Sequence, residues 1–476
     1  MSDVKAPVPQ IGQDEWARHS DDRTEPRRGL ALVGSAISDR VPWHLRLFAA
    51  LLIAALIPAA TSSSYILTVG VNTLLLTLLV LGLNVAVGWS GLLDLGYMAF
   101  YGLGAYLYSL LSSDQLNAPA GIHLPSVVSV PAVVIATGVV GLLIGLSASR
   151  VTEVYLALLT LFFAEMFLQT VSIVALPISG GPYGITNVNP LSSFGSALTS
   201  VQQYYFFTLI CLGALALLLR NLEGSRIGRA WRSVREDEFV ASFVTVPTKR
   251  IKIYAFVFGA MVAGFAGCVF AAFEAGTYPT DFGTAELFLM YAALILGGMG
   301  SIGGAIVGAV LVSVGIELLQ STTYSTGLFF AVVILALVFR IRPWRRLGVF
   351  AAAEIVFGLI VRALLVEAGH VASSPGRGLL NHAINLWLVS PNLPRVGVDW
   401  VYVGLLGAIV AVVIYPRLRR LWLLVPGVYL AAFAWVTVLV PNSSTTSELL
   451  LGGMLIVVMT LRPRGLLGTM PREVAR

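Results

Sequence analysis

The side chains best suited to binding a partner lie in one charged stretch, residues 221–251, which reads NLEGSRIGRAWRSVREDEFVASFVTVPTKRI. With the flanking Arg220 and Lys252, this stretch holds eight of the chain's 30 Lys and Arg residues, although only 11% of all residues are charged. Long apolar segments precede and follow it. Loops held by rigid elements often carry binding residues, so we predict that a soluble partner acts on the chain here.

The first part of this loop has the spacing of an amphipathic helix. Apolar residues recur at i, i+3, i+4 and i+7, and arginines occupy the other side, as in a helix that lies on a membrane surface. The apolar residues are Ile227, Ala230, Trp231 and Val234, and the arginines are Arg226, Arg229 and Arg232.

A second, shorter helix is predicted over residues 236–246. Three acidic residues open it, because carboxylates suit the positive end of the helix dipole: Glu236, Asp237 and Glu238. Its apolar face consists of Phe239, Val240, Phe243 and Val244, and Pro247 closes it. Two exposed Phe rings on a short helix favour insertion into a protein groove. The alternative is a helix lying on lipid, although grouped acids are repelled by anionic lipid.

Polar residues inside apolar segments form a second group of candidates. Glu165 is the deepest carboxylate, and such an acid faces a cavity, contacts substrate or forms an interhelical hydrogen bond. Asn84 lies beside a Gly-rich turn, where a structural role is favoured. Gly300 and Gly304 belong to a four-residue Gly spacing that lets helices approach closely; they could instead line a pathway.

Several kinds of chemistry are disfavoured by the sequence. The three lysines never follow a glycine, so the P-loop pattern that binds ATP phosphates is absent. The five histidines are scattered in tails and loops, with neither metal-ligand spacing nor a position deep in an apolar segment. Cys211 and Cys268 both lie in apolar segments, which indicates free thiols. We therefore predict no catalytic residues, no metal site and no cofactor.

The elements that position these residues are transmembrane helices. Mean hydropathy is +0.86 and 57% of residues are apolar, and roughly 20 apolar residues span a bilayer. The sequence predicts an all-α polytopic membrane protein of about 14 spans, within a range of 10–14. The spans are 47–63, 65–87, 92–112, 125–148, 152–176, 202–220, 253–275, 285–299, 301–319, 325–340, 349–366, 398–415, 421–440 and 447–461. The Gly-rich centre of 285–319 predicts a broken or re-entrant element.

Positive charge predicts the orientation. With a cytoplasmic N-terminus, 27 of the 30 basic residues lie inside, two lie outside and Arg362 lies within a span, as the positive-inside rule requires. Both termini are then cytoplasmic. We expect a polar, disordered tail at 1–46, a transmembrane core at 47–319 containing the loop 221–251, extra helices at 320–446 with an outer loop at 367–396, and a last span with the C-terminus at 447–476.

A set of motifs resembles a known family. The motifs are LGLN at 81–84, GWSGLLDLG at 88–96, FYGLGAY at 100–106, VYLA at 154–157, GGPYGI at 180–185, GRAWR at 228–232, REDE at 235–238, GGMGSIGG at 297–304 and RPRGLLG at 462–468. Together they resemble permeases of ATP-binding-cassette (ABC) importers, specifically the branched-chain amino-acid permease family, which includes urea and short-amide permeases. The resemblance covers about 65–320 and 447–468.

Two departures from the family pattern stand out. The family usually has Gly shortly after the coupling helix, whereas this chain has Thr245 there. Because Thr resists positive φ, we expect a different turn geometry. Residues near 320–446 also exceed what the family needs.

The resemblance implies a function and partners. It implies one membrane subunit of an importer for branched-chain or hydrophobic amino acids, urea or amides, in a prokaryotic plasma membrane. The partners would be a second homologous permease, two ABC ATPase subunits that bind ATP and an external substrate-binding protein, with membrane lipid around them and no nucleic acid. The binding protein would dock on 114–124, 176–200 and 276–283. The residues assigned to ATPase coupling are Arg232, Arg235, Glu236, Asp237, Glu238, Phe239 and Phe243; Asn84, Glu165, Gly300 and Gly304 are pathway or gate candidates.

Two other functional classes are alternatives. An ion-coupled secondary transporter fits broken Gly-rich helices and Glu165, but only one weak duplication, RP followed by LG at 342–348 and 462–468, is visible where inverted repeats are expected. An intramembrane enzyme needs paired catalytic groups inside spans. The sequence offers no such pair.

Overall fold

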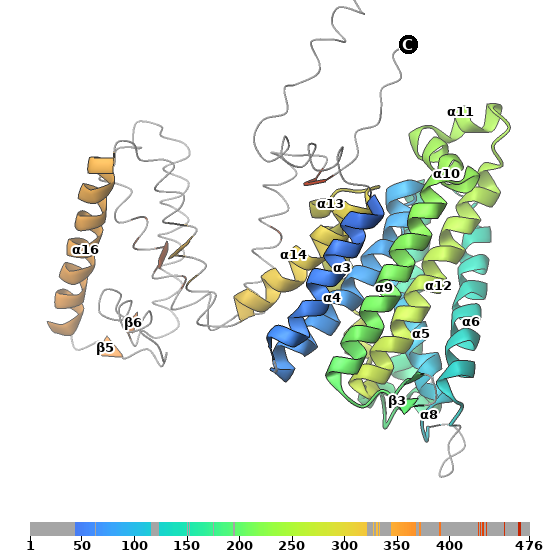
Figure 1. Ribbon diagram of the computed structural model, residues 1–476, viewed down its shortest axis with the longest axis horizontal. Coiled ribbons are helices and arrows are strands. Elements are labelled where there is room, and N and C mark those ends of the chain that lie inside the picture. Colours follow the sequence, from blue (N-terminus) through green and yellow to red (C-terminus); the bar gives the residue numbers. More distant parts are fainter. Residues whose placement is uncertain are drawn as a thin grey trace, which may run out of the picture.

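The computed structural model describes residues 43–115 apart from 62, 123–193 apart from 150, 152 and 175, 196–320, and 344–367, with short pieces beyond them that include 465–467. Within these residues, seven helices are long and apolar enough to cross a membrane. Two shorter apolar helical stretches, Leu47–Ala59 and Gly348–Ile360, accompany them. Figure 1 shows the helices as a bundle, with α16 drawn apart from it.

The bundle helices are α3 (Trp43–Ala60), α4 (Ser64–Leu83), α5 (Tyr97–Leu111), α6 (Ser126–Ala148), α7 (Glu153–Gln169), α9 (Val201–Gly224), α12 (Thr248–Glu274), α13 (Thr284–Gly297) and α14 (Ile302–Gln320), followed by α16 (Trp344–Glu367). Short helical segments extend or join them: the one-turn α-helix α8 (Leu176–Ser179), the π-helical turns η1 (Asn84–Trp89) and η2 (Thr170–Val174), and the 3₁₀ turns η3 (Gly181–Tyr183) and η4 (Pro279–Phe282). The charged loop forms α10 (Arg226–Glu236) and α11 (Glu238–Phe243).

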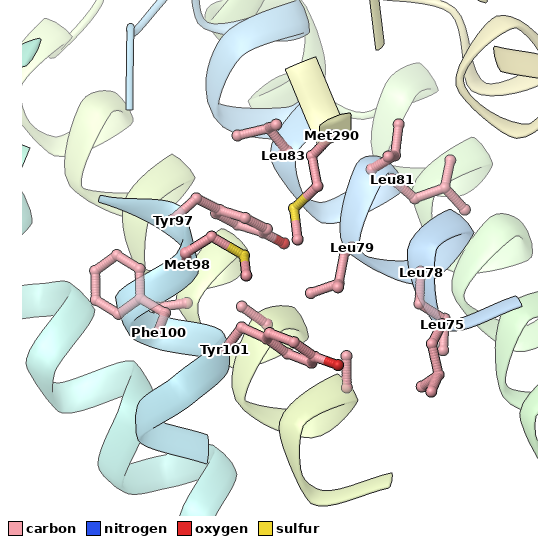
Figure 2. Packing of buried hydrophobic residues seen from close by; sticks show 14 of the residues in the cluster. Leu75, Leu78, Leu79, Leu81, Leu83, Tyr97, Met98, Phe100, Tyr101 and Met290 are labelled. Carbon is pink, nitrogen blue, oxygen red and sulfur yellow. The ribbon is translucent and has the colours of Figure 1, made fainter. Parts of the chain in front are cut away.

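Helices α4 and α12 form the centre of the bundle. Helix α12 packs against α4, α5 and α6, and α4 packs against α9 and α14. Small residues permit these approaches: a Cβ on Gly104 of α5 would lie 2.4 Å from the Gly264 carbonyl oxygen of α12. Leucines of α4 complete the core against the aromatic residues of α5 (Figure 2). Close backbone packing is the expected route to helix association in lipid.

Apolar side chains also cover the outside of the bundle. Ile135 on α6, Phe162 on α7 and Ile210 on α9 are each more than 60% exposed. In water such a surface would drive aggregation, whereas lipid tails solvate it. The exposed faces of α6 and α7 therefore fit a protein whose solvent is a bilayer.

The Gly-rich segment forms the predicted break. Helix α13 ends at Gly297, and α14 begins at Ile302. Between them, Gly298 and Gly300 have φ angles of 115° and 86°, which glycine tolerates best. A Cβ on Gly304 would lie 2.6 Å from the Gly297 carbonyl oxygen, so the Gly spacing brings the two helices together after the break.

The two ends of the bundle carry different structures. The α10 end holds α10 and α11, and the strand end holds short antiparallel strand pairs (Figure 1). Strand β1 (Ile185–Thr186) pairs with β4 (Gly276–Thr277), and β2 (Ser192–Ser193) pairs with β3 (Ser196–Ala197). Strands β5 (Val371–Ala372) and β6 (Ser390–Pro391) pair separately. The β1–β4 ladder ties the segment after α7 to the end of α12.

One predicted helix boundary differs from the structure. Helix α5 starts at Tyr97, five residues after the predicted start at 92, because Gly91 takes a φ of 73° and the turn continues to Gly96.

Some predictions fall on residues that the structure does not describe. The tail at 1–42, most of 320–343 and nearly all of 368–476, including the predicted outer loop and last spans, lie outside the described residues. The count of 14 spans, the domain boundaries and the cytoplasmic placement of both termini therefore stay predictions.

Candidate functional site

Helix α10 is fixed to the end of α9. The Ser225 hydroxyl oxygen accepts the Gly228 N–H at 3.2 Å and so caps the new helix. Arg229 donates to the Gly224 carbonyl oxygen at 2.8 Å, and Arg232 donates to the Glu223 carbonyl oxygen at 2.6 Å. These carbonyls are the unpaired acceptors at the α9 C-terminus, where cations are favoured. Arg232, a predicted coupling residue, thus holds the α9–α10 corner.

The predicted amphipathic face of α10 packs on the bundle. Trp231 and Val234 are buried, while Ile227 is 40% exposed and does not join them. The Trp231 indole N–H donates to the Ile251 carbonyl oxygen of α12 at 2.9 Å. Its ring lies 6.0 Å from that of Trp89, centroid to centroid. The helix therefore rests on protein, with Trp231 as its anchor.

The boundary between the two short helices differs from the prediction. Glu236 ends α10, and Asp237 has extended backbone with φ −161°. The Asp237 carboxylate accepts the N–H groups of Phe239 and Val240 at 2.8 and 3.0 Å, which caps α11. The chain thus turns sharply at Asp237, and the second helix is the single stretch 238–243 rather than 236–246.

Helix α11 presents a pair of Phe side chains. Phe239 and Phe243 are 71% and 73% exposed. Their rings pack edge to face, 4.8 Å apart between centroids. On the opposite side, Ala241 is buried, and Glu238 forms an ion pair with the buried Lys252 of α12 at 2.5 Å. We call Phe239 and Phe243 the Phe pair: an apolar projection held from behind by a fixed helix.

Thr245 closes α11 with a left-handed backbone. Its φ is 63°, so the turn keeps the conformation that Gly adopts most readily, and the expected change of turn geometry was wrong. The surrounding contacts, including the Val246 N–H donated to the Ala241 carbonyl oxygen at 3.3 Å, hold Thr245 in this conformation. The cost is on the order of 1 kcal/mol.

Substitutions at Thr245 should separate strain from function. Thr245→Gly should keep assembly and transport and change the free energy of unfolding by less than about 1 kcal/mol, because relief of strain is offset by added chain entropy. Thr245→Pro should displace α11, because proline fixes φ near −65°. Thermal unfolding and partner pull-down of both variants would check this. Equal tolerance of Gly and Pro would contradict the assigned turn.

A hydrogen-bonded link joins α10 to the Gly-rich break. The Arg235 guanidinium donates to the Gly88 carbonyl oxygen in the π-helical turn η1. One turn earlier, the buried Asn84 side-chain oxygen accepts the Gly300 N–H at 2.8 Å. The Trp89 indole N–H donates to the Gly300 carbonyl oxygen at 3.0 Å. Both backbone groups of Gly300 are therefore held by η1, and π-helical turns often occur at functional sites.

Steric limits keep this link tight. A Cβ on Gly88 would lie 1.9 Å from the Asn84 side-chain oxygen and 2.6 Å from the Gly300 nitrogen. A Cβ on Gly91 would approach Arg235 atoms at 3.1 Å, and its φ of 73° is left-handed. The GWSG segment thus needs glycine on both sides of Trp89 so that α10, η1 and the α13–α14 break can meet.

Asp94 lies buried in the turn between η1 and α5. Its carboxylate accepts the Gly96 N–H at 2.9 Å, and its backbone carbonyl accepts the Tyr291 hydroxyl at 2.7 Å. Burial raises the pKa of Asp94 to about 7. The charged form is disfavoured because it loses hydration.

This shift predicts a pH dependence. Between the ordinary Asp pKa and about 7, the folded state holds a proton that the unfolded state has released. Stability should therefore be higher at pH 5 than at pH 8 and level off above pH 7. Asp94→Asn should remove this part of the dependence. Unfolding temperatures at both pH values check it, and an unchanged pH profile in Asp94→Asn would contradict the assignment.

The four pathway or gate candidates do not meet at one place. Glu165 is exposed on α7, and Gly304 lies at the α13–α14 contact, whereas Gly300 and Asn84 meet in the link. Their predicted roles in a pathway or gate stay predictions. Within the residues that the structure describes, no three His, Cys, Asp or Glu side chains group as metal ligands.

One contact was not foreseen from the sequence. The N–H groups of Leu466 and Leu467 donate to the carbonyl oxygens of Leu296 and Gly297, each at 2.9 Å. The RPRGLLG motif thus satisfies acceptors at the end of α13, next to the Gly-rich break. The sequence marked this motif and the GWSG motif as distinctive, but carried no sign that both meet the same break.

Sequence comparisons with known proteins give several matches. The family described as the permease component of the branched-chain amino acid transport system matches residues 65–339. LivM, a high-affinity branched-chain amino acid permease protein of Salmonella typhimurium, is 32% identical over 335 residues, which cover 65% of this chain and 76% of LivM. Escherichia coli LivM is 32% identical, with 56% and 67% covered. Escherichia coli LivH is 28% identical, with 55% and 87% covered. No solved structure matches.

Proposed function

We infer the function from the family: the chain belongs to the permease components of branched-chain amino acid transport systems. It is a membrane-spanning permease subunit of an ABC importer, and we propose branched-chain or other hydrophobic amino acids as its substrate class. Related small solutes such as urea and amides are the alternative substrates. Permease subunits carry solute, and ATP hydrolysis belongs to separate subunits.

The Phe pair carries the assignment of the coupling site. An exposed apolar pair in a charged surface suits a groove on a partner. Lys252 and the Asp237 cap hold α11 from behind, so a force on the Phe pair is transmitted to α10 and α12. We propose that the ATPase subunit binds here on Phe239 and Phe243. Of the other coupling residues, Arg232, Arg235, Asp237 and Glu238 hold α10 and α11 in place beneath them, and Glu236 ends α10.

The link supplies a route from α10 into the membrane. Arg235 contacts Gly88, and Asn84 and Trp89 hold Gly300 at the break between α13 and α14. We propose that movement of α10 shifts this break and so opens or closes the pathway. Glycines with positive φ suit a hinge, because they accept large backbone changes without a Cβ clash.

We further propose the orientation and the partners. The α10 end faces the cytoplasm, where the basic residues gather, and the strand end faces outward. A second homologous permease, two ATPase subunits and an external binding protein complete the importer in a prokaryotic plasma membrane. The binding protein docks on 114–124, 176–200 and 276–283, segments that contain no Lys or Arg.

The test uses the assembled transporter. Co-purify the chain with its partner permease, its ATPases and its binding protein, reconstitute them in vesicles, and measure uptake of radiolabelled leucine. We expect uptake to need ATP on the side of the vesicle membrane that the α10 end faces, and the binding protein on the side that the strand end faces. Uptake by this chain alone, driven by an ion gradient, would overturn the proposal in favour of a secondary transporter.

A further inference from the structure

A half-open cavity lies between helices of the bundle, away from the coupling site, and the exposed residues Asn72 and Glu286 are part of its wall. Its volume is about 300 Å³, and its walls come from α4, α5, α12, α13 and η4. This is the lower end of the range for ligand pockets, about 300–1,000 Å³, so it suits a small solute. None of the residues that form the link between α10 and the Gly-rich break lines it.

The cavity runs along the bundle. At one extreme are Asp281 and Glu286, which follow β4 at the strand end. Asn72 and Leu79 both line it, and seven residues of helix separate them by about 10 Å. Met98, in the first turn of α5, lies toward the α10 end. The cavity therefore leads from the strand end into the membrane part of the protein.

Its two parts differ in chemistry. Asp281, Glu286 and the exposed amide of Asn72 form the polar mouth, and Leu79, Met98 and Met290 form an apolar floor. Figure 2 shows Met98 and Met290 reaching toward Leu79 from α5 and α13. Met side chains are flexible and adapt to apolar groups of different shape. The floor could thus hold aliphatic side chains of several kinds.

The charge of the mouth has one sign. The sequence contains no Lys or Arg in 47–149 or 253–339, the ranges that supply every lining residue. Glu274 lies close by, within electrostatic range of the same Tyr101 that Asp281 and Glu286 approach. A concave surface of one charge sign concentrates counter-ions. The mouth therefore selects a positively charged group.

We propose that this cavity is a solute site which binds the ammonium group of a hydrophobic amino acid at Asp281 and Glu286. The Asn72 amide faces the solute's carboxylate, and the floor of Leu79, Met98 and Met290 holds its side chain. The site deepens, and rests on, the proposed transport function. It favours amino acids over urea, which has neither a charged ammonium group nor an apolar side chain.

The first test is uptake by the complete reconstituted transporter. Asp281→Asn combined with Glu286→Gln should lower ATP-driven leucine uptake at least about tenfold, since each charge-assisted hydrogen bond is worth about 1.5–3 kcal/mol. Glu317→Gln is the matched control, because this acid lies on α14, bonds to Tyr65 and does not line the cavity. Unchanged uptake in the double variant, with wild-type uptake present, overturns the site.

The second test does not need transport. In a chain whose Cys211 and Cys268 are replaced by alanine, Asn72→Cys is treated with cationic and anionic methanethiosulfonate reagents. The cationic reagent should react at least about tenfold faster. The Asp281→Asn, Glu286→Gln background should abolish this preference, and Glu317→Gln should keep it. Equal rates, or no reaction with either reagent, overturn the cavity's charge selectivity even if leucine transport is established. Absence of wild-type uptake would instead count against the proposed function alone.

Discussion

Replacing the Phe pair with aspartates, Phe239→Asp with Phe243→Asp, should abolish ATP-driven uptake and separate the chain from its ATPase subunits. Both rings are more than 70% exposed, so they contribute little to the chain's own core. Buried anchors at an interface cost about 2 kcal/mol or more each when removed. We therefore expect at least about a hundredfold loss of ATPase affinity, measured by titrating purified ATPase onto the reconstituted chain.

The stability of the isolated chain provides the control. Surface changes of this kind shift the free energy of unfolding by about 0.5 kcal/mol or less, so thermal unfolding should be nearly unchanged. Phe239→Leu with Phe243→Leu keeps apolar side chains and should retain part of the affinity. Normal assembly and uptake in the aspartate variant would show that the ATPase binds elsewhere or not at all.

Trp231→Ala should have the opposite signature, with a large loss of stability. The Trp231 ring is 1% exposed, packs against Trp89 and bonds to the Ile251 carbonyl oxygen. Removing a buried aromatic side chain costs about 3–5 kcal/mol. Helix α10 would lose its anchor on α12, so uptake should fall with the unfolding temperature. Differential scanning calorimetry of the purified chain in detergent measures the unfolding temperature, and the uptake assay measures transport.

A second variant separates packing from hydrogen bonding. Trp231→Phe keeps a buried ring but leaves the Ile251 carbonyl without its indole donor, which costs about 1–3 kcal/mol. We expect an intermediate unfolding temperature and measurable transport. Wild-type stability in Trp231→Ala would mean that α10 does not depend on this anchor, which would remove the mechanical connection between the Phe pair and the bundle.

The proposed coupling site and the proposed solute site lie at different ends of the bundle. The Phe pair and Arg235 lie at the α10 end, whereas Asp281 and Glu286 lie near the strand end. Helices α4 and α13 connect them, because each contributes to the cavity and ends at the link or the break. A movement of the break between α13 and α14 would therefore displace Leu79 and Met290 in the apolar floor of the cavity.

Patterns of neighbouring residues in the sequence predicted several of the helices and the break between α13 and α14. The spacing of Ala230, Trp231 and Val234 predicted the amphipathic helix, because periodicity of 3.6 residues places them on one face. The helix was expected on the membrane surface, whereas Trp231 and Val234 are buried against the protein and Ile227 is exposed. Length and apolar character likewise predicted the membrane helices, and the Gly-rich run predicted the break, since these are properties of adjacent residues.

Thr245 shows where local reasoning fails. A residue that resists positive φ was expected to change the turn, yet contacts around α11 hold it at 63°. Tertiary packing can override a preference of about 1 kcal/mol. The helix boundary at Asp237 shifted for a local reason. Its backbone is extended so that its carboxylate can cap α11, and an extended residue cannot continue α10.

The sequence by itself determined that this chain is a helical membrane protein of its family with a charged loop at 221–251, because hydropathy, charge asymmetry and motifs are local properties. Only the tertiary structure decided that Gly88 meets Arg235, that Asn84 meets Gly300 and that Met98 and Met290 share a cavity with Asp281. These pairs are far apart along the chain, and their contact depends on how close-packed helices align. No single-sequence pattern encodes that alignment, because in lipid it is set by the fit of one helix surface against another.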